Sequence, residues 1–290
     1  MCSSDLGHSD AMLVGAGSGA LTQGEPDSKG VTKGAAQDTL MAQYNDLASV
    51  ERLLEANDGA VAAVIVEPVA ANMGVVPPED GFLQGLRTLC DRHGALLIFD
   101  EVITGFRLAA GGAQEYFGVQ ADLVTYGKII GGGMPVGAYA GSRALMEQVA
   151  PTGPVYQAGT LSGNPVAMAA GLAQLNIITD HPEIYTVMET SASYIANHLR
   201  ASAERHGIAM QVNQIGSLLC PYFTETPVNC YAAAKKSDTK RYAAYFNGML
   251  KRGIYLAPSQ FEAMFVSSVH TQNDLACTVQ AAEETLSEMA

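Results

Sequence analysis

Short apolar runs alternate with amphipathic segments along the first half of this chain. The spacing of leucine and valine predicts one helix from Asp46, a good N-cap residue, to Gly59, and another from about Asp80 to Gly94. Nearly continuous apolar runs predict strands, and these runs span residues 61–66, 95–99, 123–126 and 136–140. Buried strands that alternate with helices favour an α/β fold with a parallel sheet covered on both faces.

The pattern changes in the second half. Asn164-Pro165 opens a helix that is apolar nearly all round, as a buried connector between domains would be. After His181 the pattern predicts a smaller α+β domain, so the chain is expected to divide into 1–39, 40–180 and 181–290. The expected elements of the domain 181–290 are a long helix to about His206, strands near 208–223, a helix from Asp238 to Arg252, two short strands around 254–269 and a last helix from Thr271.

Composition and charge exclude several classes of function. Of the 290 residues 48% are hydrophobic and 16% charged, which is typical of a compact globular protein. The formal net charge of −13, without a long basic cluster, makes a nucleic-acid partner unfavourable. No apolar run approaches the roughly 18 residues of a membrane span. The five cysteines and six histidines show no metal-ligand spacing, so we expect no metal site and reduced thiols in a cytoplasmic protein.

Two of the predicted strands lead into residues that could carry chemistry. Lys128 follows the strand at 123–126, and Asp100 and Glu101 follow the strand at 95–99. The carboxyl ends of strands in such sheets meet in one crevice. An amine and a carboxylate there suit pyridoxal phosphate, because the lysine binds it covalently and the carboxylate keeps the ring nitrogen protonated. A solvated surface lysine and ordinary capping acids are the alternatives.

Period-2 alternation points the two acids to opposite sides, and we assign the cofactor role to Asp100. A carboxylate at the end of an apolar strand is costly to bury unless it meets a cation. Val102, on the face of Asp100, would pack against the cofactor ring.

Two glycine-containing segments flank this candidate site. Gly131-Gly132-Gly133 matches neither common phosphate-loop motif, and it indicates a close backbone approach around the lysine. Gly159 and Thr160 precede a helix N-terminus and are better candidates to bind a phosphate, although a hydroxyl residue there is usually only a cap.

Several runs of residues together resemble the class III pyridoxal-phosphate aminotransferases, from about Gly7 to the end. The broader resemblance rests on Glu67-Pro68-Val69, Phe99-Asp100-Glu101-Val102, Thr104-Gly105-Phe106-Arg107, Gly127 to Gly133 and Gly159 to Pro165. Other stretches resemble more narrowly the glutamate-1-semialdehyde 2,1-aminomutases within that family. These are Ala16 to Gly19, Asn72 to Pro78, Gly112 to Gly118, Gly153 to Thr160 and Tyr255 to Ala263.

The resemblance implies a fold and a set of residue roles. The fold would be the fold type I of pyridoxal-phosphate enzymes, with 40–180 as the cofactor-binding large domain and 181–290 as the small domain. Lys128 would hold the cofactor and move protons, and Asp100 would pair with its ring nitrogen. Asn72 would lie near its phenolic oxygen, although an asparagine here can be simple turn chemistry. Thr160 would bind the phosphate of a neighbouring subunit in a homodimer. Glu262 would reach the active site, unless it is a solvated loop acid.

The long loop before residue 40 fits the aminomutase branch. Residues 15–33 resemble its gating loop, with Gly17, Ser18 and Gly19 near the tip. An aminomutase exchanges amino groups within one molecule, so a lid that retains the intermediate is useful. The implied reaction is the isomerisation of glutamate-1-semialdehyde to 5-aminolevulinate in tetrapyrrole (porphyrin) biosynthesis. The alternatives are an ω-amino acid aminotransferase and an inactive remnant.

The chain departs from the family at its start. Family members carry well over a hundred residues before the position of Gly7, which include a phosphate loop, substrate-carboxylate contacts and a stacking aromatic residue. Met1 to Leu6 resembles nothing in the family, and our interpretation is that this stretch is foreign to an N-terminally truncated chain. We expect such a chain to bind the cofactor weakly and to turn over little.

Overall fold

The computed structural model of the chain describes residues 9–14 and 28–290. The loop tip predicted at Gly17, Ser18 and Gly19 lies outside the described residues. The chain forms two compact units. The first consists of Met1–Pro68 and Asp80–Asp180, and the second of Val69–Glu79 and His181–Ala290.

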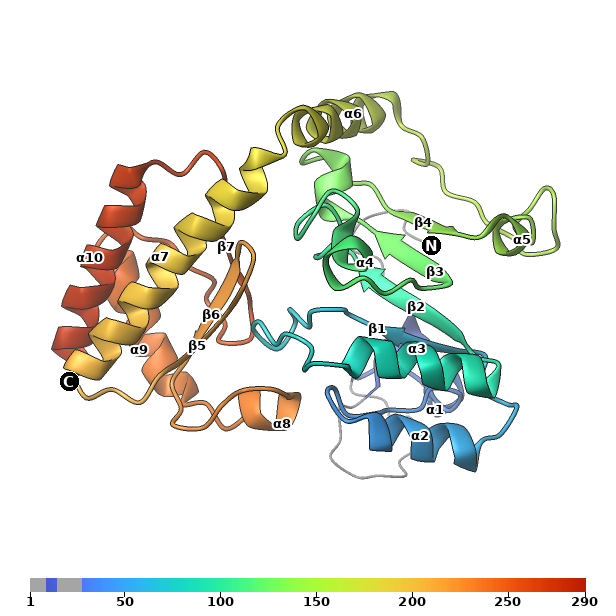
Figure 1. Cartoon of the computed structure of the whole chain (residues 1–290), viewed down its shortest axis with the longest axis horizontal. Coiled ribbons are helices and arrows are strands. Elements are labelled where there is room, and N and C mark those ends of the chain that lie inside the picture. Colours follow the sequence, from blue (N-terminus) through green and yellow to red (C-terminus); the bar gives the residue numbers. More distant parts are fainter. Residues whose placement is uncertain (1–8, 15–27) are drawn as a thin grey trace. The chain divides into compact units, whose positions relative to one another are not determined.

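The first unit is built on a four-stranded sheet. Its strands are β1 (Ala63–Val66), β2 (Leu96–Glu101), β3 (Leu123–Tyr126) and β4 (Ala138–Gly141), in the spatial order β1-β2-β3-β4 (Figure 1). β1, β2 and β3 run parallel, and β4 is antiparallel to β3. The mostly parallel sheet is as expected. β4 is the exception because no crossover helix separates it from β3, and parallel neighbours need a crossover of about a dozen or more residues, usually helical.

Two helices cover one face of this sheet. α2 (Leu47–Ala56) and α3 (Phe82–His93) lie next to each other there (Figure 1). Asp46 caps α2 as predicted, since its carboxylate accepts a hydrogen bond of 3.0 Å from the Ser49 N–H. Gly94, with φ +68°, ends α3. The core between helices and strands is apolar and includes Val50, Leu54, Leu83, Leu86, Leu97, Phe99 and Val124.

The remaining helical segments of the first unit are mostly short. They are η1 (Asp10–Met12), α1 (Lys33–Ala36), α4 (Gly112–Phe117), η2 (Lys128–Gly131), α5 (Arg143–Met146) and α6 (Pro165–Asp180).

The prediction that α6 is buried was wrong. Only Ala167, Gly171 and Ile178 of this helix are buried. Val166 and Leu172 are each 62% exposed. An apolar pattern indicates that a helix avoids water, but it does not identify the surface that covers it. In this chain Ala167, Gly171 and Ile178 are buried, while other large apolar side chains of the helix remain exposed.

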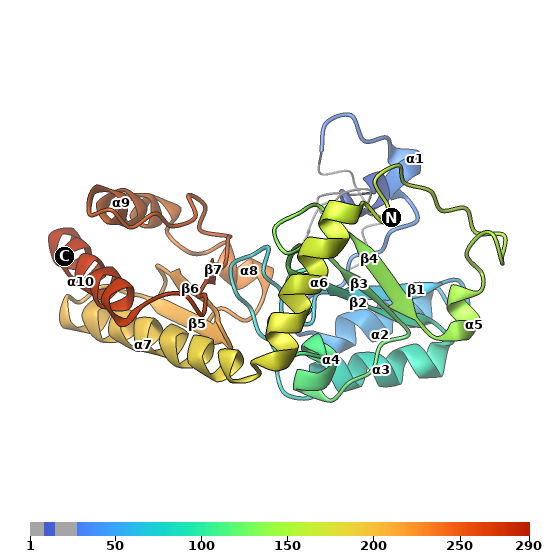
Figure 2. The ribbon, with the colours of Figure 1, turned by 90° about the horizontal axis from the view of Figure 1, so that it is seen from above.

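The second unit is an α+β structure with an antiparallel sheet. Its strands β5 (Gln211–Ile215), β6 (Leu218–Tyr222) and β7 (Met264–Phe265) lie in that order. α7 (Glu183–Arg205), α9 (Thr239–Lys251) and α10 (Gln272–Met289) pack with them, as Figure 2 shows from above, and α8 (Tyr231–Ala234) is a single turn. The core that these elements share includes Leu199, Leu219, Tyr245, Met249 and Leu286.

The segment Val69–Glu79 belongs to this second unit, although its position in the sequence precedes α3. A bridge between Ala70 and Val76 closes it into a loop. The Tyr222 hydroxyl donates a hydrogen bond of 2.9 Å to the Met73 carbonyl, and the Gly74 N–H donates one of 2.8 Å to the Phe261 carbonyl. The loop is therefore held by the small sheet and by the chain after α9.

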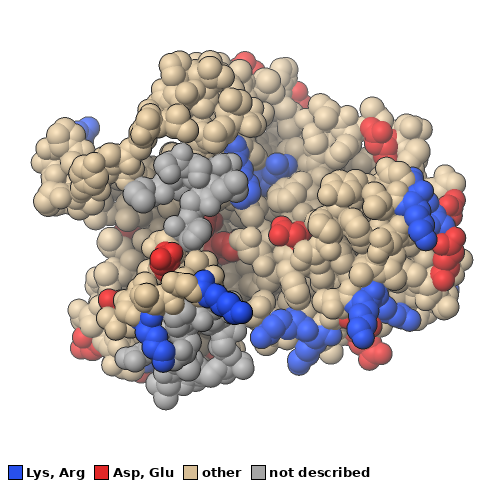
Figure 3. Space-filling view, turned by 180° about the vertical axis from the view of Figure 1, so that it is seen from behind, with Lys and Arg blue, Asp and Glu red and all other residues tan. Residues whose placement is uncertain are grey.

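Among the described residues, no helix combines the length and the hydropathy that a membrane span requires. In the same part of the chain, no three His, Cys, Asp or Glu side chains are grouped so that they could hold a metal ion. On the face shown in Figure 3, lysine and arginine side chains form separate small groups and no continuous basic patch.

Candidate active site

Lys128 lies just beyond the carboxyl end of β3, at the start of the single turn η2. Its side chain is exposed. Its backbone has φ +48°, in the left-handed region that non-glycine residues seldom adopt. Such a conformation costs free energy and persists only where the surroundings impose it, which is common at functional sites.

Close packing against α6 fixes the turn that carries Lys128. A Cβ atom on Gly132 would lie 2.4 Å from the Ala170 carbonyl oxygen, and one on Gly171 would lie 2.1 Å from the Ile130 carbonyl oxygen. Backbone therefore meets backbone on both sides of this contact. The glycine run does mark a close approach, and its neighbour in this structure is α6.

Asp100 is the second-last residue of β2, and its carboxylate is partly exposed. Its Oδ1 accepts a hydrogen bond of 3.0 Å from the Val102 N–H and one of 3.3 Å from the Thr125 hydroxyl. No described residue donates a hydrogen bond to Oδ2. Val102 follows the end of β2 and its N–H binds Asp100, so strand alternation does not determine where its side chain lies.

Glu101 points to the opposite side of β2, as period-2 alternation predicts. It is fully buried and caps the start of α4. Its carboxylate accepts hydrogen bonds from the Ala113 N–H at 2.5 Å, the Thr104 hydroxyl at 3.2 Å and the Gln114 N–H at 3.4 Å. Burial raises the pKa of Glu101, against the opposing effect of these three donors. Glu101 is therefore a structural acid.

Lys128 and Asp100 extend from the same edge of the sheet. Asp100 pairs with Thr125 in the parallel register of β2 and β3, and Lys128 follows three residues after Thr125. A pocket of about 1030 Å³ lies within the first unit, along β1 and residues 37–44, and Asp100 is one of its lining residues. Lys128 is not among the lining residues, so this pocket alone does not define the site.

Gly159 and Thr160 lie in the irregular segment that leads to α6, and Thr160 is exposed. The N-terminus of α6 is closer to Asn164, whose Oδ1 accepts hydrogen bonds from the N–H groups of Val166 and Ala167 at 3.1 and 3.2 Å. These N–H groups are therefore already used. An anion at Gly159 and Thr160 would depend on their own N–H and hydroxyl groups rather than on the helix end.

The remaining predicted site residues belong to the second unit. Asn72 is exposed within the loop that the Ala70–Val76 bridge closes, and Glu262 is exposed between α9 and α10. These two residues therefore belong to a different unit from Lys128 and Asp100.

The residues at the strand ends fit two groups of pyridoxal phosphate, its aldehyde and its ring nitrogen. A primary amine lies on a constrained turn, and on the neighbouring strand a carboxylate keeps one oxygen without a hydrogen bond from the described residues. That free oxygen suits a protonated ring nitrogen.

Comparisons with known proteins identify the family. Residues 7–280 match the family described as aminotransferase class-III. This chain belongs to that family. The glutamate-1-semialdehyde 2,1-aminomutase of Ruminiclostridium cellulolyticum is 63% identical over 282 residues, which cover 97% of this chain and 65% of that protein. The chain thus spans slightly less than two thirds of the length of this curated relative.

Solved structures of class III enzymes share the fold. An omega-transaminase from Sphaerobacter thermophilus superposes with a TM-score of 0.85 at 29% identity, covering 97% of this chain and 65% of that one. A glutamate-1-semialdehyde aminomutase from Pseudomonas aeruginosa, in complex with PMP, gives a TM-score of 0.83 at 26% identity, covering 97% and 63%. The α/β fold with a mostly parallel sheet is thus confirmed as that of this family.

Sequence reasoning missed Thr125, whereas capping, the alternative named for both acids, is the role of Glu101. Thr125 is the only residue of β3 with an aliphatic hydroxyl, since the other hydroxyl in this strand is the phenol of Tyr126. This was a usable signal, but its value depends on the register that places it opposite Asp100.

Proposed function

We propose that the protein to which this chain belongs is a pyridoxal-phosphate-dependent aminomutase that isomerises glutamate-1-semialdehyde to 5-aminolevulinate. The 63% identity to a curated aminomutase over nearly the whole chain is the main support. The juxtaposition of Lys128 and Asp100 at adjacent strand ends supports the cofactor assignment. A small-molecule amino aldehyde is the substrate class in this proposal.

In this proposal, different residues of the chain bind the cofactor and act on the substrate. Bound pyridoxal phosphate supplies an aromatic ring that accepts electrons from the substrate carbon. Lys128 would hold it covalently and carry protons between substrate carbons, and Asp100 would keep the ring nitrogen protonated. Asn72 is proposed to lie near the phenolic oxygen, and Val102 against the ring. Glu262 is proposed to act on the substrate from the second unit.

The proposal includes a homodimer in which Gly159 and Thr160 bind the phosphate of the neighbouring subunit. The exposed apolar side chains of α6, together with Tyr156 at 83% exposure and Leu161 at 56%, support an interface in this region. We place the enzyme in the cytoplasm. The described cysteines are all free thiols, in keeping with a reducing compartment.

Isomerisation without an external amino acceptor is the decisive activity. Purified protein, saturated with pyridoxal phosphate, is given glutamate-1-semialdehyde alone, and 5-aminolevulinate is measured by conversion to a pyrrole. We expect product from the unsubstituted parent protein. We also expect it from Lys251→Ala, which changes a lysine at the end of α9. We expect none above background from Lys128→Ala. No product from the parent at full cofactor occupancy would contradict the proposed reaction.

An ω-amino acid aminotransferase is the second candidate, favoured by the structural similarity to an omega-transaminase. The two functions differ in their need for a second substrate. If amino transfer to pyruvate or 2-oxoglutarate is faster than isomerisation by about tenfold or more, the aminotransferase assignment replaces the aminomutase.

A further inference from the structure

The two oxygens of the Asp100 carboxylate are in different environments. Both hydrogen bonds from described residues go to Oδ1, and their donors come from different elements. The Val102 N–H is two residues away in the same chain segment, whereas the Thr125 hydroxyl belongs to β3. Oδ2 receives no hydrogen bond from the described residues.

A single local donor leaves a carboxylate free to rotate about its last side-chain bond, because that torsion is broad. A second donor on the neighbouring strand restricts this rotation. Thr125 is the register partner of Asp100, so both side chains lie on the same face of the sheet. Toward an ionised carboxylate the hydroxyl can only donate. Val124, the preceding residue, is buried on the opposite face.

We propose that Thr125 is a positioning residue for the proposed cofactor site: by donating to Oδ1 it turns Oδ2 of Asp100 toward the cofactor's ring nitrogen. This inference rests on the proposed function, and it adds a residue that neither touches the cofactor nor reacts. Without the hydroxyl, Asp100 remains present, but among the described residues only the Val102 N–H still holds its carboxylate.

The first test needs no cofactor. A double-mutant cycle combines Thr125→Val, which keeps the side-chain shape, with Asp100→Ala, and measures urea unfolding of the 290-residue chain without cofactor. A hydrogen bond to a charged group predicts that the two changes are coupled, by about tenfold in the unfolding equilibrium constant. If the two effects simply add, no interaction links the residues and the proposal fails.

The second test measures cofactor binding by absorbance titration. Thr125→Val should raise the dissociation constant of pyridoxal phosphate by about tenfold, the usual order for loss of one charge-assisted hydrogen bond. Thr125→Ser, which retains the hydroxyl, should stay within about twofold of the parent. In the Asp100→Ala background, Thr125→Val should cause no further loss. Thr88→Val, an exposed site on α3, is the matched control.

The outcomes separate this inference from the proposed function. If the parent chain binds no cofactor at millimolar concentration, the proposed function loses its support, while the unfolding cycle still decides whether Thr125 holds Asp100. If the parent binds and Thr125→Val binds equally well, the cofactor assignment stands and the role of Thr125 is wrong. An equal loss in the Asp100→Ala background would show a merely structural effect and would also overturn it.

Discussion

At the scale of single residues, one strand of this protein places two adjacent acids in opposite environments. Asp100 is partly exposed, with one oxygen free of hydrogen bonds from the described residues, and Glu101 is fully buried against the start of α4. The alternation of side chains along β2 is sufficient to separate them. Two neighbouring positions on one strand therefore supply a partly exposed carboxylate and a buried structural one.

The burial of Glu101 predicts a distinctive dependence of stability on pH. Its pKa is raised in the folded state, so the folded chain keeps this proton at pH values where the unfolded chain has lost it. The resulting contribution to stability is full below the ordinary pKa of about 4.5, and it falls as pH rises through the raised pKa. We therefore expect the parent chain to lose free energy of unfolding relative to Glu101→Gln as the pH rises from 4.5 through the raised pKa.

Urea unfolding of both proteins across this pH range provides the measurement. Glu55→Gln, an exposed change on α2, should follow the parent at every pH. Parallel curves for the parent and Glu101→Gln would contradict the assignment of a raised pKa.

Single residues could be predicted from the sequence where the alternation of a strand or the type of side chain was informative by itself. The sequence indicated that Asp100 and Glu101 face apart, and it singled out Lys128. It could not predict the left-handed backbone of Lys128 or the hydroxyl of Thr125 on Asp100, because both depend on how β3 and its following turn are packed.

At the scale of secondary-structure elements, the contact between η2 and α6 determines where Lys128 is held. A Cβ on Gly171 would lie 2.1 Å from the Ile130 carbonyl oxygen, so even alanine requires α6 to move. Gly171→Ala should lower the free energy of unfolding by about 1–3 kcal/mol through overpacking. It should also slow covalent attachment of the cofactor to Lys128.

Urea unfolding and the rate of cofactor attachment check this prediction. Gly34→Ala in α1 is the matched control, because a Cβ there meets nothing within 4 Å. Equal stability of Gly171→Ala and Gly34→Ala would mean that the close contact does not constrain the turn.

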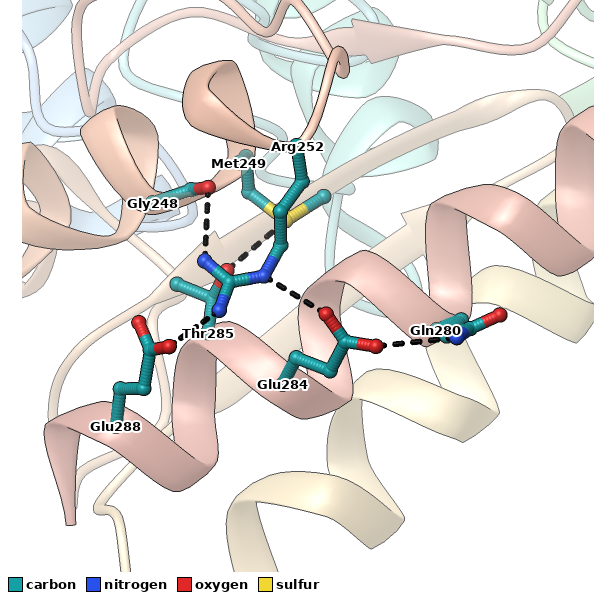
Figure 4. Close-up of polar contacts among 7 residues, drawn as sticks. All are labelled: Gly248, Met249, Arg252, Gln280, Glu284, Thr285 and Glu288. Carbon is teal, nitrogen blue, oxygen red and sulfur yellow. Dashed lines mark hydrogen bonds and ion pairs between the residues drawn. The ribbon is translucent and has the colours of Figure 1, made fainter.

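An ion-pair cluster joins α9 to α10 in the second unit. Arg252, at the end of α9, binds Glu284 at 3.0 Å and Glu288 at 2.5 Å, and also donates to the Gly248 carbonyl at 3.2 Å (Figure 4). We expect Arg252→Gln to lower the urea midpoint slightly, because exposed ion pairs contribute little. The difference in urea midpoint between Arg252→Gln and the parent should become smaller in 1 M NaCl, because salt screens the ion pairs.

Arg143→Gln, which removes an exposed ion pair between the first residue of α5 and its C-cap residue Glu147, should lower the urea midpoint less. If the urea midpoint of Arg252→Gln is lowered equally at low and high salt, packing and not charge accounts for the effect.

Element-scale prediction was best for helices with clear caps. Asp46, Gly94 and Asp238 mark the ends of helices as the sequence indicated. β3 occupies its predicted residues, whereas β2 continues to Glu101, two residues beyond its predicted end. The direction of β4 depends on its connection to β3 rather than on its composition, so an apolar run alone could not indicate it.

At the scale of the whole molecule, the apolar pattern predicted the fold class. It did not predict that α6 is exposed, or which unit each segment belongs to. α6 was expected to be buried and is largely exposed, since hydrophobicity carries no information about which surface covers a helix. The loop Val69–Glu79 groups with the second unit through long-range hydrogen bonds, which no local pattern records. Such contacts between distant parts of the chain limit what a single sequence can predict.

The central claim is that Lys128 binds pyridoxal phosphate covalently, opposite Asp100. Borohydride reduction of the cofactor-loaded protein, followed by peptide mapping, tests it most directly. The account predicts a stable label on Lys128, with none on Lys251 above the background of an unreduced sample. Label on a different lysine, or none at full cofactor occupancy, would contradict the account.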